Sequence, residues 1–316
     1  MESDLKVLTR LRRETVALLY ELAPIEGYNL SALPDVRFVR SNRPLTRTPV
    51  LYDPGIVIVC QGRKRGYLGE EVYLYDADHY LVVSVPLPFA METDATEREP
   101  MLAIYLRLDF NVAADLMLQL DERDALSRAK PRGMATTRLD VRLSETVLRL
   151  LQAVSDPLEA QILGPALVRE IYFRVFMGDQ GGSMRAALNR QGHFGSVSRA
   201  LRKIHQAFAQ PLTVEELAAE ANMSVSTFHA HFKDVTDTSP IQYIKSTRLH
   251  QARLLMARSG LTAAAAAANV GYESSSQFSR EFKRLFGSSP IEEVQRMQRY
   301  FAVPAPAPDS IYVSSH

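Results

Sequence analysis

The clearest pattern of hydrophobic positions lies near the C-terminus, between residues 262 and 290. Phe278, Phe282, Leu285 and Phe286 recur at the spacing of one buried helix face. An alanine-rich run, 263–268, precedes them and stops at Gly271, where a tight turn favours a residue without a Cβ. The pattern therefore predicts two helices joined by a turn. The exposed face of the second helix carries Ser275, Ser276, Ser279, Arg280 and Lys283.

The same pattern occurs about fifty residues earlier, which indicates an internal repeat. Phe228 and Phe232 stand opposite Phe278 and Phe282. Residues 240–258 between the two copies read as a single helix that begins at a proline. At about 1.5 Å per residue this helix spans roughly 27 Å. It could hold two recognition helices near one DNA turn apart, about 34 Å.

The doubled pattern resembles the DNA-binding domain of the AraC/XylS family of transcriptional regulators, over residues 195–300. In the second half the resemblance rests on Gly271-Tyr272, Phe278-Ser279-Arg280, Phe282-Lys283, Phe286-Gly287 and Ser289-Pro290. In the first half it rests on Leu217-Ala218, Asn222-Met223-Ser224, Pro240, Tyr243-Ile244 and Arg248-Leu249. One position departs from the family pattern. Ala230 stands where many relatives carry a larger polar residue, so the first half is expected to read fewer bases.

The N-terminal half has a different pattern of hydrophobic residues. Residues 36–109 contain short β-branched and aromatic runs separated by Pro, Gly and Asp, which predicts a small barrel or sandwich. Residues 4–22 read as an amphipathic helix. Residues 61–66 read as a charged turn, because Gly62 and Gly66 bracket three basic residues. The segment resembles the cupin-like effector domain of one branch of the same family, through Gln61-Gly62-Arg63-Lys64, Tyr67-Leu68-Gly69, Val72-Tyr73, Tyr80-Leu81-Val82-Val83-Ser84 and Pro165-x-Leu167.

These observations predict an α+β chain of two domains. The first, 1–180, is an effector-sensing and dimerisation domain, a cupin-like β-barrel at about 28–110 with helices at 111–177. A Gly-, Asn- and Gln-rich linker is expected at 181–194, and an all-α double helix-turn-helix domain at 195–300. The Pro/Ala-rich residues 301–316 read as a disordered tail.

Composition and charge restrict the possible partners and location of the chain. The net charge of +1 conceals an asymmetry, because residues 195–301 carry 13 Lys/Arg against 9 Asp/Glu, which suits phosphate contact. The single cysteine, Cys60, excludes an intramolecular disulfide framework and fits a reducing cytoplasm. No apolar run approaches 18 residues and the N-terminus has no signal-peptide pattern, so neither a membrane span nor secretion is expected.

The predicted DNA-contacting residues come from both recognition helices and the helix between them. Arg280 is the strongest candidate for a base contact, since arginine can bond two acceptors on a guanine edge. His229 is preferred to His231, which borders the buried side of its helix. The full set is Ser226, Thr227, His229, Ala230, Lys233, Arg248, Ser275, Ser276, Ser279, Arg280 and Lys283.

Candidate effector contacts lie in the barrel. Cys60 is either a sensing thiol, whose pKa the basic residues 63–65 would lower, or a small buried core residue, which is the more frequent role of a free cysteine. Each aromatic side chain could line a pocket or fill the core; Tyr73 and Tyr75 are expected on the same side of a strand. The candidates are Cys60, Tyr67, Tyr73, Tyr75 and Phe89.

Metal and catalytic sites are not predicted. The barrel segment holds one histidine, His79, so a three-histidine metal site there is excluded, and no nucleophile–His–acid set or phosphate-binding loop is found.

The predicted function is a cytoplasmic, non-enzymatic DNA-binding regulator, an activator without a cofactor, controlled by a small-molecule effector or an electrophile. Expected partners are promoter DNA, RNA polymerase and a second copy of the chain. A cupin-like enzyme fused to a targeting module and a ligand-independent DNA-binding protein remain as alternatives.

Overall fold

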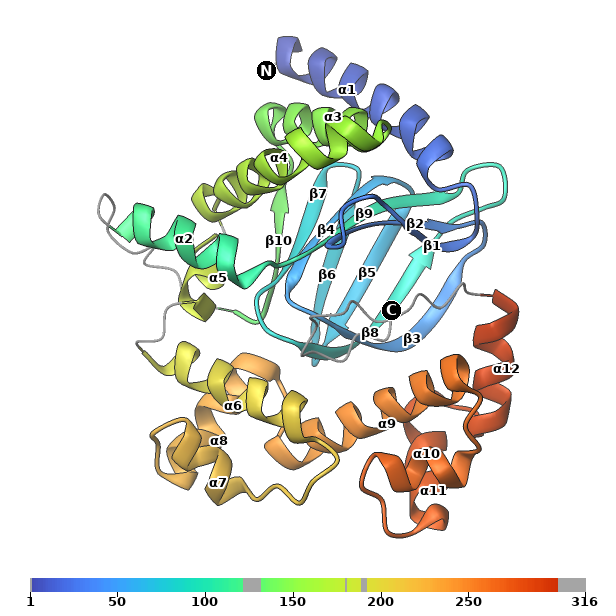
Figure 1. The fold of residues 1–316 in the computed structure, drawn as a ribbon, viewed down its shortest axis with the longest axis vertical. Coiled ribbons are helices and arrows are strands. Elements are labelled where there is room, and N and C mark those ends of the chain that lie inside the picture. The colour runs from blue at the N-terminus through green and yellow to red at the C-terminus, as the bar shows by residue number, and fades with distance from the viewer. Residues whose placement is uncertain (1, 122–131, 180, 189–191, 301–316) are drawn as a thin grey trace.

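The computed structural model describes residues 2–121, 132–179, 181–188 and 192–300. The predicted tail, 301–316, lies outside the described residues. Within that part of the chain, no helix is long and apolar enough to cross a membrane. Helices α1, α3 and α4 lie at one end of the molecule, the sheet lies in the middle, and the C-terminal helices lie at the other end (Figure 1).

The N-terminal domain is built on one antiparallel sheet that curls into a half-barrel. The path of hydrogen-bonded strands runs β1-β2-β9-β4-β7-β6-β5-β8-β3, and β10 pairs with β7 off this path. The predicted α+β class is confirmed, with a half-barrel as the observed form. The strands are β1 Gly27–Leu30, β2 Val36–Ser41, β3 Leu45–Tyr52, β4 Gly55–Gln61, β5 Arg63–Leu68, β6 Glu71–Asp76, β7 His79–Val83, β8 Leu87–Asp94, β9 Met101–Arg107 and β10 Met134–Arg138.

Alternation along the strands separates two apolar layers. In β4, Ile56, Ile58 and Cys60 face the helices, whereas Val57 and Val59 face the inside of the half-barrel. The helical layer covers the outer face and shares one core with it. Its helices are α1 Glu2–Leu22, α2 Phe110–Asp121, α3 Val141–Val154 and α4 Pro157–Met177.

Two local predictions differ from the structure. The basic residues 63–65 are not a turn, because they begin strand β5, which pairs with β6 and β8. Part of the expected linker is helical: α5, Gly181–Leu188, buries Met184 and Ala187 against neighbouring elements. Local composition missed both because the deciding contacts are tertiary.

The C-terminal domain contains seven helices among the described residues. Thr213 caps α7 with a complete capping box, and Ser224, Ser239, Thr262 and Ser274 cap the four helices that follow. The predicted connecting helix, 240–258, corresponds to α9. The helices are α6 His193–Ala207, α7 Val214–Glu220, α8 Val225–Thr236, α9 Pro240–Ser259, α10 Ala263–Asn269, α11 Ser275–Phe286 and α12 Pro290–Tyr300.

The two domains meet along the half-barrel in close contact. A Cβ built on Gly69 would lie 1.9 Å from the Asp237 carboxylate, and one built on Gly133 would lie 2.4 Å from the Val235 carbonyl. The Tyr243 hydroxyl donates to the Pro86 carbonyl at 2.8 Å, and Leu51 of β3 packs against residues of α9 and α12. The end of α8 and the length of α9 are therefore docked on the sheet.

Candidate DNA-binding surface and effector site

The first helix-turn-helix consists of α7 and α8. Phe228 and Phe232 are fully buried, and their rings lie 5.3 Å apart. The N-terminal end of α8 is held by Ser224, whose hydroxyl accepts from the Thr227 amide. The predicted contact residues of this helix are all exposed on its other side: Ser226, Thr227, His229, Ala230 and Lys233.

The second helix-turn-helix, α10 and α11, repeats this arrangement. Phe278 and Phe282 are fully buried, and Phe282 also packs against Phe286 with ring centroids 4.5 Å apart. Arg280 forms no ion pair with any other described residue. An exposed cation and small hydroxyl groups on a capped helix suit contact with base edges and phosphates. The predicted residues here are again exposed: Ser275, Ser276, Ser279, Arg280 and Lys283.

Arg248 differs from the other predicted DNA contacts. Its guanidinium group donates to the carbonyls of Phe208, Gln210 and Gly271 at 2.7, 3.0 and 3.1 Å. These bonds tie α9 to the end of α6 and to the turn of the second helix-turn-helix. In this structure the donors of Arg248 are directed at the protein backbone.

Glu281 was not predicted, although it fixes the second recognition helix. Its carboxylate accepts from Lys245 of α9 at 2.8 Å and from the Tyr272 hydroxyl at 2.8 Å. The side chain is 12% exposed, and the hydrogen bonds from Lys245, Tyr272 and Gln277 lower its pKa against the effect of burial. An acidic residue between Arg280 and Lys283 was the available sequence signal.

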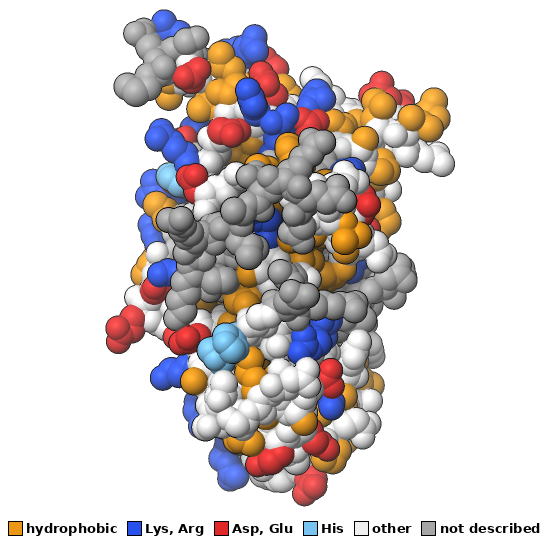
Figure 2. All heavy atoms as spheres, turned by 90° about the vertical axis from the view of Figure 1, so that its left-hand side faces the viewer, with side chains coloured by type: hydrophobic (Ala, Val, Ile, Leu, Met, Phe, Trp, Pro, Cys, Tyr) orange, Lys and Arg blue, Asp and Glu red, His pale blue; other side chains and the backbone are white. Residues whose placement is uncertain are grey.

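The face shown in Figure 2 has no single patch of one charge. On the face shown in Figure 2, basic and acidic side chains are interspersed over both halves of the molecule. On this face, charge alone does not distinguish the predicted DNA contacts from other exposed residues.

The aromatic candidates of the half-barrel divide between the two faces of the sheet. Tyr73, Tyr75 and Phe89 are buried in the inner layer, as expected for the shared side of Tyr73 and Tyr75. Tyr67 belongs to the other face, where its hydroxyl donates to Glu92 at 2.6 Å and Arg47 lies 4.3 Å above its ring. The geometry does not bring Tyr67 together with the other three.

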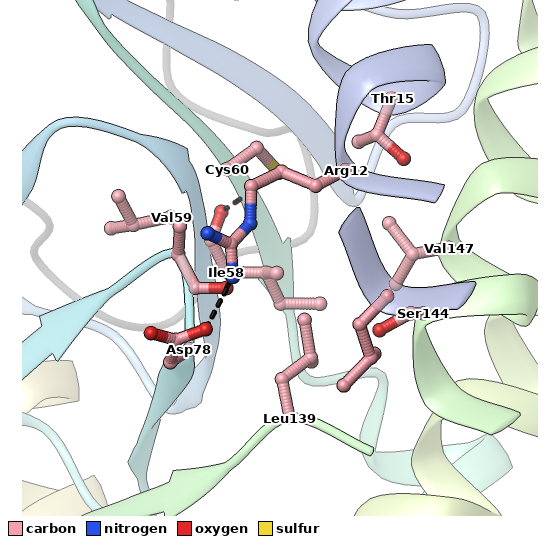
Figure 3. Close-up of a pocket in the computed structure, with 11 residues that line it drawn as sticks. Arg12, Thr15, Ile58, Val59, Cys60, Asp78, Leu139, Ser144 and Val147 are labelled. Atoms are coloured by element: carbon pink, nitrogen blue, oxygen red, sulfur yellow. Dashed lines mark hydrogen bonds and ion pairs between the residues drawn. The ribbon is translucent and has the colours of Figure 1, made fainter. Parts of the chain in front are cut away.

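Cys60 also lies away from the inner aromatic layer. It lines a cavity of about 30 Å³ between β4 and α1, and the ion pair of Arg12 with Asp78 borders this cavity (Figure 3). A cavity of this size holds a water molecule or two and is too small for an organic effector. A more open cleft of about 760 Å³ shares Arg12, Cys60 and Asp78 with it.

Of the two interpretations of Cys60, the structure supports the buried core residue and contradicts the activated thiol. Burial raises the pKa of Cys60 to about 12, and the nearby Arg12 offsets only part of this. Of the basic residues, Lys64 is buried in the inner layer and Arg65 pairs with Asp94 at 2.7 Å. His79, read as a structural or surface residue, contacts Asp76 at 3.0 Å. No cluster of metal-ligating side chains is present in the described ranges.

Cys60 is therefore expected to react slowly with thiol reagents. With a pKa of about 12, the thiolate fraction at neutral pH falls roughly a thousandfold below that of an ordinary cysteine. We expect Ellman's reagent to label the native chain at least about 100-fold more slowly than the chain in 8 M urea. Cys60→Ala should leave the response of a promoter reporter unchanged. Equal labelling rates, or a response lost in both Cys60→Ala and Cys60→Ser, would restore the thiol-switch hypothesis.

Comparison with known proteins finds a family model that matches each of the two domains. Residues 32–183 match the model of the AraC-type transcriptional regulator N-terminus, and residues 217–296 match a helix-turn-helix domain. AlkR, an HTH-type transcriptional regulator of Acinetobacter baylyi, is 39% identical over 94 residues, which are 30% of this chain and 31% of AlkR. A putative AraC-like regulator of Streptomyces lividans is 30% identical over 157 residues, covering 46% of this chain and 51% of that protein. The chain thus spans about a third to a half of the length of these curated relatives.

Solved structures give the same fold over most of the chain. ToxT of Vibrio cholerae, in a structure with a bound unsaturated fatty acid, matches with a TM-score of 0.53 at 13% identity. The match covers 88% of this chain and 100% of that one. A second ToxT structure gives a TM-score of 0.55 at 12% identity, over 82% of this chain and 98% of ToxT. An AraC-type regulator N-terminus and a helix-turn-helix domain are thus matched in order along this chain.

Proposed function

We propose that this chain is a sequence-specific DNA-binding transcriptional regulator controlled by a small molecule sensed in the half-barrel. The observation that carries the proposal is the pair of exposed recognition faces, on α8 and α11, joined by the single helix α9. Because α9 is buried against both subdomains and against β3, it can hold the two faces in a fixed relation. The names of the curated relatives, which are transcriptional regulators and activators, support this role.

In this proposal the exposed recognition residues divide into two roles. Arg280 and His229 read base edges, whereas Lys233 and Lys283 contact phosphates, with the small hydroxyl residues positioning both helices. Arg248 is reassigned: its three carbonyl bonds support a structural role in holding α9 to the two subdomains. Ala230 contributes only a small apolar contact.

Control by an effector would act through the domain interface. The Tyr243 hydroxyl bridges the buried His205, 2.7 Å away, and the Pro86 carbonyl at the start of β8. A ligand that binds the two arrangements of this interface unequally shifts their populations, and so the DNA affinity. The bound fatty acid in one ToxT structure supports a small-molecule role for this type of domain.

Further partners complete the proposal. We place the regulator in the cytoplasm, acting as a non-enzymatic activator that contacts RNA polymerase. Self-association is supported by an apolar stripe on α4, where Leu158, Ile162 and Phe173 are exposed by 68, 66 and 42%.

Arg280→Ala is expected to weaken specific DNA binding by about 1–3 kcal/mol and to relax preference at one base position. The site would be obtained by selecting from a random DNA pool with the full-length chain, and affinity measured by fluorescence anisotropy. Lys283→Ala is the matched control, because this residue is exposed on the same helix. It should weaken binding to all sequences and lower the salt-dependence slope by about 1.

Both variants should keep the wild-type melting temperature, since neither side chain is buried. Unchanged base preference in Arg280→Ala would remove that residue from sequence readout. If the full-length chain selected no common sequence from the pool, the proposed function itself would fail.

A further inference from the structure

The two helix-turn-helix units are attached to the half-barrel in different ways. The inner layer of the half-barrel and the core of the first unit form one continuous cluster of buried side chains. Val235 at the end of α8 and Tyr243 near the start of α9 belong to this cluster, as do Leu87 and Met134 of the half-barrel. The core of the second unit, around Phe282, is a separate cluster. The inner layer is therefore completed by the first unit and not by the second.

Two strand edges of the half-barrel, one on β6 and one on β10, have little or no backbone pairing. Strand β6 pairs with β5 along its length but with β7 only at Asp76 and His79. Strand β10 pairs with β7, and no ladder joins it to β6 within the described residues. The Glu71–Arg132 ion pair connects the starts of β6 and β10 at 2.7 Å, with side chains exposed by 55 and 54%. Because exposed ion pairs contribute little stability, these two edges need another element to hold them together.

The C-terminal end of α8 contacts both edges. Gly69 lies in the turn before β6, and a Cβ built there would lie 1.9 Å from the Asp237 carboxylate. Gly133 lies directly before β10, and a Cβ built there would lie 2.4 Å from the Val235 carbonyl. The two contacting residues of the DNA-binding domain are only two positions apart in the chain. One short segment thus connects the two strands that the backbone ladder leaves unconnected.

We propose that the first unit, α6 to α8 with the start of α9, is the lid of the half-barrel, so that opening the inner layer to a small molecule releases this unit and leaves the second in place. The inference rests on the proposed function and names the half of the DNA-binding surface that an effector controls. A ligand that binds only the open form favours release of α8, and by reciprocity release of α8 favours entry of the ligand.

The second unit remains because it is attached to another part of the sheet. Figure 1 shows the first unit below β10 and the second unit beside β3. Leu51 of β3 packs with Leu254 of α9 and Met297 of α12. Arg253 of α9 donates to the Pro49 carbonyl of β3 at 3.4 Å. Since the start of α9 belongs to the lid and its end is held at β3, the lid moves about α9.

A disulfide between the lid and the half-barrel tests the proposal on the full-length chain. The variant Cys60→Ala/Gly69→Cys/Asp237→Cys removes the carboxylate next to residue 69 and places two thiols within bonding reach, because the Asp237 carboxylate atoms lie 1.9–3.2 Å from the ideal Cβ position of Gly69. Amide hydrogen exchange measured by mass spectrometry would compare the oxidised and reduced forms. Oxidation should slow exchange in β6, β10 and α8 by about tenfold or more and leave α10 and α11 unchanged.

Tyr243→Phe tests the same contact without a new covalent bond. The hydroxyl donates to the Pro86 carbonyl at 2.8 Å and lies 2.7 Å from His205 Nε2, while the ring packs against Phe232. The bond to Pro86 exists only while the lid is closed, whereas the bond to His205 lies within the first unit and is lost in both forms. The variant should therefore raise exchange in β6, β10 and α8 roughly tenfold, the effect of one hydrogen bond, with α10 and α11 as the internal reference.

Three results would overturn the proposal. The first is exchange in β6 and β10 that neither the disulfide nor Tyr243→Phe alters. The second is an equal response of α8 and α11, because both units would then leave together. The third is a response of α8 without one in β6 and β10, since the half-barrel would then stay closed when the lid is released. If the disulfide variant does not fold, Tyr243→Phe decides alone.

DNA binding separates this proposal from the proposed function. Arg280→Ala identifies the half of the selected DNA site that α11 contacts, and fluorescence anisotropy would then compare both halves with the oxidised and reduced forms. Base substitutions in the α8 half should change in effect by about fivefold or more between the forms, and those in the α11 half should not. Equal changes in both halves overturn the assignment of control to the first unit. A chain that selects no site contradicts the proposed function, while the exchange experiment still tests the lid.

Discussion

Phe282→Ala is expected to destabilise the C-terminal domain by about 3–5 kcal/mol, the usual cost of removing a buried phenylalanine. Phe282 is fully buried, and its ring packs between Phe278 and Phe286 with centroids 5.5 and 4.5 Å away. The surrounding core also includes Ala266, Ala267 and Val270 of the preceding helix-turn, which are small residues with little freedom to fill a cavity. The variant should therefore lose DNA binding through loss of the second helix-turn-helix.

Urea denaturation of the full-length chain, followed by circular dichroism, would measure this change. Lys283→Ala, one residue along the same helix and exposed, provides the control and should stay within about 0.5 kcal/mol of the wild type. A loss below about 1 kcal/mol for Phe282→Ala would mean that α11 is not held by this aromatic core.

Glu293→Gln is expected to cost a similar amount, about 3–5 kcal/mol, because it removes one partner of a buried ion pair. Arg253 of α9 and Glu293 of α12 lie 3.2 Å apart, with side chains only 3 and 1% exposed. Burial lowers the pKa of Arg253 to about 10 against the opposing effect of Glu293. Arg253 also donates to the Pro49 carbonyl of β3 at 3.4 Å, so the pair connects both domains.

The double variant Arg253→Met/Glu293→Leu distinguishes charge from packing. Replacing both partners removes the unpaired charge, so most of the stability lost in Glu293→Gln should return. The free energies of unfolding would come from the same urea experiments. If the double variant were less stable than Glu293→Gln, the geometry of the pair, rather than the balance of charge, would hold α12 in place.

The sequence predicted well where structure depends on local pattern. The second recognition helix was placed by its phenylalanine spacing, and α9 by the proline at its start, with an observed end one residue beyond the predicted 240–258. Strands such as β4 and β9 were visible because runs of β-branched and apolar residues are typical of buried strands.

What the sequence could not supply was the partner of each strand. Strand β8 contains Pro88, a residue that disfavours the interior of a sheet, yet it pairs with β3 and β5. Lys64 was read as part of a charged turn, and only the register of β5 between two neighbours shows that it points inward. Tyr67 was assigned to the pocket for the same reason, since strand parity depends on where the strand begins.

Four residues with a left-handed backbone conformation occupy matching positions in the two halves of the C-terminal domain. Asn222 and Gly271 occupy matching positions in the turns of the two helix-turn-helix units, with φ of 55° and 83°. Asp237 and Gly287 match in the same way after the recognition helices, with φ of 55° and 78°. Only glycine adopts this conformation freely, although asparagine and aspartate tolerate it better than other residues. The two units therefore share a left-handed backbone conformation at both positions, although the residue that adopts it differs between them.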